Sequence, residues 1–158
     1  MNITLRPVSE SDDPFLYALY ASTRASEMAL VPWPDSHKHA FLQMQFAAQR
    51  TSYAKQYPDA QHTVICRDGQ PVGRLYLSRS QERFHILDIT VADTHRNQGI
   101  GTVVLREVLQ EAENAGKPTT IHVENFNPSV RLFERLGFRP AGVNDFLILL
   151  ERPPDSLN

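Results

Sequence analysis

A pair of glycines opens the stretch of this sequence with the most evident chemistry. Gln98-Gly99-Ile100-Gly101 lies where an apolar, strand-like run has ended and a helical pattern begins, although glycine is the poorest ordinary helix former. Glycine lets the backbone approach another group closely, and the first four N–H groups of a helix have no partners within it. These donors add to the positive end of the helix dipole. The spacing therefore predicts an anion site, with phosphate as its natural ligand.

Two nucleotide-binding turns and a plain packing role are the alternative explanations for the glycine pair. The phosphate-binding loop of nucleotide triphosphatases is excluded because no GxxxxGK[ST] occurs. A dinucleotide-binding turn fits poorly, because Val104 stands at the third glycine position and seven residues separate Val91 from Gly99. A plainer alternative is that both glycines only let the helix pack against a sheet, and the glycines alone do not decide against it.

Two carboxylates, Asp88 and Glu124, are the best placed candidates for a general base. Asp88 lies in the predicted strand before the helix and Glu124 in the strand after it. Because side chains alternate along a strand, Leu87 and Ile89 are expected on one face, with Asp88 and Thr90 on the other. Burial disfavours a charged carboxylate, which suits a base. For both residues, however, a structural role, such as pairing with an arginine, is the more common outcome.

The histidines offer weaker candidates. His85 and His122 alternate within the same two strands and can titrate near neutrality. A lone histidine in a strand is more often structural, so neither is assigned a catalytic role. His37, Lys38 and His39 form no metal set without paired ligands elsewhere, and the sequence predicts no metal site.

These candidates must be positioned by an alternation of strands and helices. Hydrophobic periodicity, caps and turns predict strands at 3–6, 61–67, 71–78, 84–91, 119–124, 139–143 and 146–151, and helices from about 13, at 39–57, from 100 to 115 and at 128–136. The helix after Gly101 has one apolar stripe of Ile100, Val104, Val108 and Ala112, with Leu105 and Leu109 beside it. In the helix at 39–57 the expected stripe is Phe41, Met44, Ala48 and Ser52. The run from 84 to 124 is a βαβ unit, and the fold class is α/β (α+β).

Composition limits the cellular setting and the partners. The 158 residues fit a single domain at 1–152, followed by a loose tail at 153–158. A hydrophobic content of 41% and a net charge of -2 give no overall attraction to nucleic acid or anionic membranes. Cys66 is the only cysteine, which suits a reducing compartment, and no apolar run reaches 18 residues. We therefore expect a cytoplasmic protein without nucleic-acid or membrane partners, as a monomer or homodimer.

Two linked motifs carry a family resemblance. Arg96-Asn97-Gln98-Gly99-Ile100-Gly101 fits the pattern [RQ]xxGxG/A that opens a helix after a strand and a short loop. NPSVRLFERLGF at 127–138 is similar to a second signature, commonly NPAxxLYxxLGF, at the expected distance. Together they resemble the GNAT superfamily of acyl-CoA-dependent N-acyltransferases. The resemblance covers the chain from about Val64 to the end and is weak before residue 60.

The resemblance implies a fold and a cofactor site. The fold would be a mixed, mostly antiparallel sheet of about six to seven strands, flanked by about four helices. The N–H groups of 98–102 would hold the pyrophosphate of acetyl-CoA, and the strand before them would splay from its neighbour and offer its backbone to the pantetheine arm. The cofactor-binding residues implied are Ile89, Thr90, Val91, Arg96, Asn97, Gln98, Gly99, Ile100, Gly101, Thr102, Asn127, Ser129, Leu132 and Phe133.

One position departs from the family pattern. Family members often protonate the departing thiolate with a tyrosine in the second signature, and here that position is Phe133. A phenyl ring cannot donate a proton, so another acid or water would serve, or the thiolate would leave unaided. A thiol pKa of about 8.5, by analogy with cysteine, makes unaided departure tolerable.

The residues that would select an acceptor are less clear. The early helices carry Trp33, Gln45, Gln49, Tyr53 and Tyr57. Gln45, Gln49 and Tyr53 form a polar stripe at i, i+4 and i+8. This stripe would face an acceptor or, more commonly, solvent.

Three functions from different classes remain on the sequence alone. The leading one is an N-acetyltransferase that moves an acetyl group from acetyl-CoA directly to a primary amine of a small molecule or peptide, in a ternary complex. The second is a non-catalytic acyl-CoA-binding or regulatory module. The third is a structural interaction domain.

Overall fold

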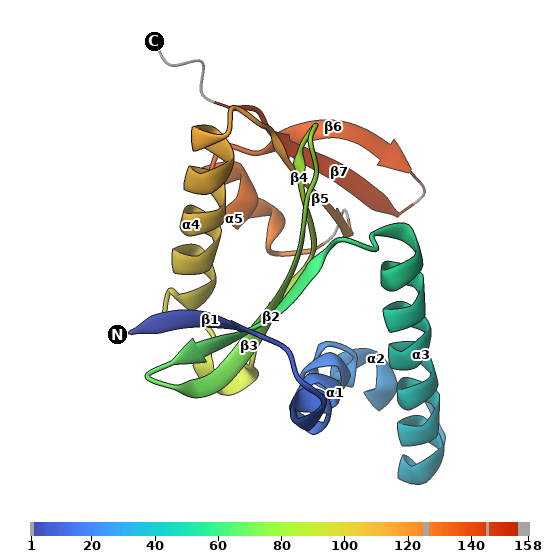
Figure 1. The fold of residues 1–158 in the computed structure, drawn as a ribbon. Coiled ribbons are helices and arrows are strands. Elements are labelled where there is room, and N and C mark those ends of the chain that lie inside the picture. The colour runs from blue at the N-terminus through green and yellow to red at the C-terminus, as the bar shows by residue number, and fades with distance from the viewer. Residues whose placement is uncertain (1, 125–126, 145, 155–158) are drawn as a thin grey trace.

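The computed structural model describes residues 2–124, 127–144 and 146–154. Its strands form a seven-stranded sheet in the order β1-β2-β3-β4-β5-β7-β6. The strands are β1 (Ile3–Pro7), β2 (Gln61–Arg67), β3 (Gln70–Arg79), β4 (Phe84–Val91), β5 (Thr119–Glu124), β6 (Arg139–Asn144) and β7 (Leu147–Arg152). The helices are α1 (Asp13–Thr23), α2 (Ala25–Ala29), α3 (Asp35–Gln56), α4 (Ile100–Asn114) and α5 (Val130–Arg135), with 3-10 turns η1 (Glu10–Asp12) and η2 (Asp93–His95). Figure 1 shows α4 and α5 on one side of the sheet and α1, α2 and α3 on the other.

The sheet confirms the expected fold class. Neighbouring strands pair antiparallel except β4 and β5, which are parallel. The described residues contain five α-helices, where about four were expected. The unexpected helix is α2, whose five residues are too few to show a helical period in the sequence. The predicted tail at 153–158 lies outside the described residues from 155 onward.

The parallel pair β4–β5 joins the two halves of the sheet over a short length. Among the described residues, only Phe84, His85 and Ile86 have partners on β5, which are Thr119, Thr120 and Ile121. Beyond these residues the strands continue without pairing to each other, as the resemblance implied. A strand edge without a partner leaves backbone N–H and C=O groups to be satisfied by something else.

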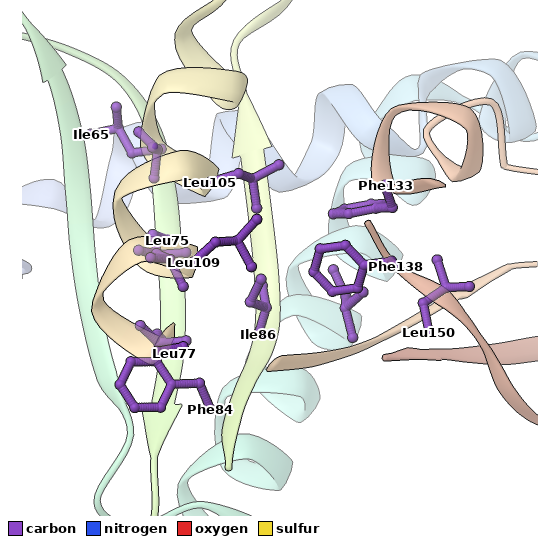
Figure 2. Packing of buried hydrophobic residues seen from close by; sticks show 14 of the residues in the cluster. Ile65, Leu75, Leu77, Phe84, Ile86, Leu105, Leu109, Phe133, Phe138 and Leu150 are labelled. Atoms are coloured by element: carbon purple, nitrogen blue, oxygen red, sulfur yellow. The ribbon is translucent and has the colours of Figure 1, made fainter. Parts of the chain in front are cut away.

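The main core lies between the sheet and α4. The buried residues of α4 are Ile100, Val104, Leu105, Val108, Leu109 and Ala112, the stripe that the sequence predicts. Figure 2 shows Leu105 and Leu109 packed against Leu75, Leu77 and Ile86 of the sheet. Gly116 ends this helix with φ +67°, a conformation that glycine adopts without strain.

A second core lies on the other side, between α1 and α3. Leu16 and Tyr20 of α1 pack with Leu42 and Phe46 of α3. The predicted stripe of α3 is wrong, since Met44 in it is 63% exposed. Contacts with α1 decide which face is buried, and both apolar sets fit a helical period.

The start of α3 also differs from the prediction. The helix begins at Asp35, directly after Pro34, rather than near His39. Proline fixes a φ that is compatible with the position just before a helix. The negative charge of Asp35 is stabilised in the first turn by the positive end of the helix dipole. No helix in the described parts of the chain is both long enough and apolar enough to cross a membrane.

Candidate functional site

The predicted site residues converge on one cleft. The cleft has a volume of about 950 Å³ and runs from the N-terminus of α4, between β4 and β5, to the junction of α1 and α2. The predicted residues that line it are Asp88, Ile89, Thr90, Val91, Arg96, Asn97, Gly99, Ile100, Gly101, Thr102, Glu124, Asn127, Ser129, Leu132 and Phe133. Only Gln98 is missing, because its side chain accepts a hydrogen bond from Arg67. The structure thus brings together residues that span almost fifty positions of the sequence.

The N-terminus of α4 forms one end of the cleft, which we call the glycine end together with the start of α5. Asn97 and Gly99 have φ of +64° and +78°, so the chain turns sharply before the helix. The N–H of Val103 makes a helical bond of 3.0 Å to the carbonyl of Gly99. The N–H groups of Gly101 and Thr102 precede this bond and have no acceptor within the helix. They lie at the positive end of the helix dipole.

Glycine is favoured at positions 99 and 101 for different physical reasons. Gly99 needs its positive φ, which side chains disfavour. Gly101 has no such need, and a Cβ placed on it would make only an ordinary contact of 3.9 Å with Cγ2 of Val91. Packing of α4 against the sheet therefore does not require glycine at 101. Room for a group outside the chain would explain a glycine here, which favours the anion site over the packing alternative.

Arg96 is the cationic side chain at this end that the sequence singles out. Its Nη1 lies 2.8 Å from the carboxylate of Asp93, and its Nε donates to the carbonyl of Val91 over 3.1 Å. The side chain is 47% exposed and lines the cleft. These contacts fix the turn between β4 and α4 and leave part of the guanidinium open to an anion.

A bulge in β4 controls which side chains face the cleft. Tyr76 of β3 pairs with Asp88, but the next residue, Leu77, pairs with Ile86, so Leu87 is an extra residue without a partner. The prediction that Leu87 shares a face with Ile89 is therefore wrong. Ile86 and Ile89 face α4, whereas Asp88 and Thr90 face the side of α1 and α3, as predicted.

Asp88 is held in a network with a buried arginine. Nε of Arg74 donates to Oδ2 of Asp88 over 2.6 Å, and the Thr90 hydroxyl donates to the two carboxylate oxygens at 3.1 and 3.0 Å. The Arg74 side chain is 3% exposed and that of Asp88 27%. This is the structural pairing that the sequence left open as the common outcome for a strand carboxylate.

Glu124 has a different setting at the end of β5. Its side chain lines the cleft and makes no ion pair within the described residues. Its carbonyl accepts the N–H of Asn127 at 2.9 Å, and Oδ1 of Asn127 accepts the N–H of Ser129 at 2.9 Å. The carboxylate of Glu124 is therefore the less engaged of the two candidate bases.

The two histidines separate into a buried one and an exposed one. His85 is 5% exposed, lies 2.7 Å from the Thr120 hydroxyl through Nδ1, and stacks on Tyr57 at 5.4 Å between ring centroids. Burial, with the nearby charges of His122 and Arg83, lowers the pKa of His85 to about 4. It is neutral at pH 7 and structural. His122 is exposed, lines the cleft and lies edge-on to His85 at 5.2 Å.

Phe133 belongs to the core as much as to the cleft. It is 3% exposed and meets Phe138 in a T-shaped contact with ring centroids 5.3 Å apart. Figure 2 shows the two rings beside Leu150 of β7. The side chain fills space that a tyrosine ring would also fill, but it brings no hydroxyl to the cleft.

The other end of the cleft, which we call the arginine end, is lined by Arg24, Gln49, Tyr53, Arg74, Asp88, His122 and Glu124. Gln49 and Tyr53 of the predicted polar stripe line it, but Gln45, Trp33 and Tyr57 do not. The Tyr53 hydroxyl donates to the carbonyl of Leu87 over 3.2 Å. The sequence patterns did not single out Arg24 or Arg74. The one signal present was an arginine in the apolar strand sequence PVGRLYL.

The structure gives no positive indication of a metal centre. Within the ranges that it describes, no three His, Cys, Asp or Glu side chains are grouped so as to hold a metal ion.

Comparison with solved structures places the fold. The PaiA N-acetyltransferase from Thermoplasma acidophilum in complex with coenzyme A superposes with a TM-score of 0.73 at 14% identity, over 97% of this chain and 99% of that one. The ribosomal-protein-S18-alanine N-acetyltransferase from Escherichia coli gives 0.65 at 19% identity, over 99% of both chains. A GNAT family acetyltransferase from Elizabethkingia anophelis with acetyl-CoA bound gives 0.58 at 21%, over 96% of this chain and 98% of that one. At such identities the likeness concerns the fold.

The sequence comparison defines the family. The mixed, mostly antiparallel sheet with its flanking helices matches the fold of the GNAT acetyltransferases. The chain belongs to the acetyltransferase (GNAT) family, whose model matches residues 16–138. This range includes both sequence motifs and every predicted site residue. No protein with a curated description matches the sequence.

Proposed function

We propose that the protein is an N-acetyltransferase that moves the acetyl group of acetyl-CoA directly to a primary amine of a small molecule or peptide. The observation that carries the proposal is the glycine end, where unpaired N–H groups of α4 and the unpaired edge of β4 open into the same cleft. An anion is needed at the first and an amide-bearing arm at the second. Acetyl-CoA carries both in one molecule.

The residues present fit this cosubstrate. Gly101 leaves room where a Cβ would stand, and the adjacent N–H groups would hold the pyrophosphate with Arg96 beside them. The backbone of 89–91 lies beyond the last β4–β5 pair, at Ile86 and Ile121, and would bind the pantetheine arm. Asn127, Ser129, Leu132 and Phe133 form the facing wall from the start of α5.

Direct transfer requires a base for the amine. We assign this role to Glu124, because Asp88 is engaged by Arg74 and Thr90. Glu124 would take a proton from the amine as its nitrogen forms a bond to the acyl carbon and the carbon–sulfur bond breaks. The electron pair of that bond leaves on sulfur, and water protonates the thiolate, since Phe133 has no proton to give.

The alternative is a non-catalytic acyl-CoA-binding module with the same cleft, and the absence of a hydroxyl at Phe133 is the observation that favours it. One measurement tests both functions, and a second separates them. Isothermal titration with acetyl-CoA should give saturable binding for both, and absence of binding heat would refute both. Release of free thiol from acetyl-CoA over a panel of amines should exceed the rate without amine only for the enzyme.

A further inference from the structure

The arginine end of the cleft contains a cation that its own network leaves incomplete. Arg74 donates to Asp88 through Nε and to Oε1 of Gln49 through Nη2, over 2.6 and 2.8 Å. Its Nη1 is buried and has no hydrogen-bond partner among the described residues. A guanidinium has five N–H donors, and burying any of them without an acceptor is costly. Because Arg74 lines the cleft, an acceptor oxygen from outside the chain can approach its guanidinium, and it would reach the covered Nη1 after a small shift of the side chains around that atom.

A second, more accessible guanidinium lies close by. Arg24, at the junction of α1 and α2, lines the same cleft, is 32% exposed and covers the Tyr20 ring at 5.3 Å. Its contact with Glu27, at 3.6 Å, joins neighbours on one helical turn. Such a pair is weak, because Glu27 is 64% exposed to solvent. Arg24 therefore keeps donors available for a ligand.

The charges of both guanidinium groups act on the same tyrosine. Burial raises the pKa of the Tyr53 hydroxyl to about 12, the charge of Asp88 adds to this rise, and the charges of Arg74 and Arg24 oppose it. The two arginines, from β3 and from the α1–α2 junction, line the same cleft as Tyr53.

The side of the cleft that β5 forms carries the opposite charge. Glu124 and His122 lie on β5, two residues apart and therefore on one face of the strand. Burial alone would lower the pKa of Arg24. The Tyr20 hydroxyl and the charges of Glu27 and Glu124 outweigh it, so the pKa of Arg24 is raised overall. Arg24, at the α1–α2 junction, and Glu124, on β5, line the same cleft. A ligand in the cleft meets the guanidinium groups of Arg24 and Arg74, the latter paired with Asp88, and the carboxylate of Glu124 on β5.

We propose that the acceptor is an amine that carries a carboxylate within a few bonds of its nitrogen, as amino acids do. Its carboxylate binds Arg24 and the free donors of Arg74, and its amine lies toward Glu124. Guanidinium groups suit a carboxylate because their planar forks match its two oxygens. This inference rests on the proposed function, and it names the substrate class of the same site.

The first test compares matched acceptors. Thiol release from acetyl-CoA is measured with amino acids whose amine and carboxylate are one, two or three carbons apart, with their amides, and with the corresponding decarboxylated amines. In at least one series the free acid should have a kcat/KM at least about tenfold above that of its amide, the equivalent of about 1.4 kcal/mol. Polyamines or amides that match or exceed every acid would overturn the proposal.

Variants of Arg24 test its part without removing the buried network. Arg24→Gln should lower kcat/KM for the acid by about tenfold and leave the amide within threefold, whereas Arg24→Lys should recover part of the loss. Arg106→Gln, an exposed arginine of α4 outside the cleft, is the matched control and should change neither. An acid-to-amide ratio that Arg24→Gln leaves unchanged would remove Arg24 from the site.

A binding measurement keeps this inference separate from the proposed function. N-acetylated amino acids and their amides, the products of the two acceptor classes, are titrated into the protein with and without saturating CoA. Tighter binding of the acids, weakened by Arg24→Gln, supports the carboxylate site even if no amine releases thiol, in which case the proposed enzyme alone fails. Equal binding of acids and amides would refute the carboxylate site even in an active enzyme.

Discussion

The two ends of the cleft are built from different parts of the polypeptide. The glycine end uses backbone groups, namely the N–H groups at the start of α4 and the free edge of β4. The arginine end uses side chains from five elements or junctions, held by the contacts of Arg74 with Asp88 and Gln49. A backbone site serves one invariant ligand group and needs only local geometry. A side-chain site can be changed residue by residue, which suits the part of an enzyme that selects its acceptor.

The largest effect should come from the one candidate base at the arginine end that is not engaged in a network. Glu124→Gln removes proton acceptance, so kcat should fall by about 100-fold or more, with CoA affinity unchanged. Thiol release as a function of pH measures the effect. Glu134→Gln, on the exposed face of α5, should retain full activity. A Glu124→Gln enzyme with undiminished kcat would exclude Glu124 as the base.

A change at the glycine end should act on binding instead. Gly101→Glu places bulk and negative charge beside the N–H groups of α4, so CoA should bind about 100-fold more weakly, equivalent to about 2.7 kcal/mol. Isothermal titration measures it. Gly142→Glu is the matched control, because its Cβ would contact nothing within 4 Å and it lies outside the cleft. Unchanged CoA affinity in Gly101→Glu would refute the assignment of this end.

Asp88 should separate structural from catalytic roles within the arginine end. Asp88→Asn leaves the Arg74 guanidinium, 3% exposed, without its charged partner. The free energy of unfolding should therefore drop by about 2 kcal/mol, less than the roughly 3–5 kcal/mol for a fully buried pair because Asp88 is partly exposed. Urea denaturation measures it, and Glu124→Gln should change stability by less than about 0.5 kcal/mol. Equal stability of the two variants would contradict the assigned difference.

The last effect concerns the pH dependence of stability and comes from His62 of β2, which does not line the cleft. Burial and the charges of Arg74 and Arg50 lower the pKa of His62 to about 4, from an ordinary 6.5. The unfolded chain binds the proton first, so stability is full above pH 6.5 and is lost as pH falls toward 4.

A variant isolates this contribution. His62→Phe can keep the stack on Tyr76, whose ring centroid is 4.4 Å from that of His62, and cannot titrate. Between pH 6.5 and 4 it should lose about 2 kcal/mol less stability than the wild type in denaturant unfolding. Parallel pH profiles for the two proteins would show that His62 does not titrate in this way.

What could be predicted from the sequence follows the same division. The glycine end was predictable because Gln98–Gly101 lies in a contiguous strand–turn–helix segment, whose backbone geometry is local. The long strands and α4 were predictable because their apolar periods are regular.

The arginine end was not predictable, because its contacts are tertiary. The meeting of Arg74 with Asp88, 14 residues apart, depends on the register of β3 and β4. A bulge at Leu87 shifts that register, and no residue type announces it. The buried face of α3 was likewise decided by α1, so Met44 was misplaced.

The brief parallel seam between β4 and β5 has a mechanical consequence. In the part of the chain that the structure describes, three residue pairs make up the strand pairing that connects β1–β4 to β5–β7. On heating, the two halves of the sheet should separate first where β4 and β5 are no longer paired. A ligand bound between β4 and β5 that contacts both strands would raise the melting temperature through mass action. It would also slow amide exchange, most strongly in the residues next to the point where the two strands separate.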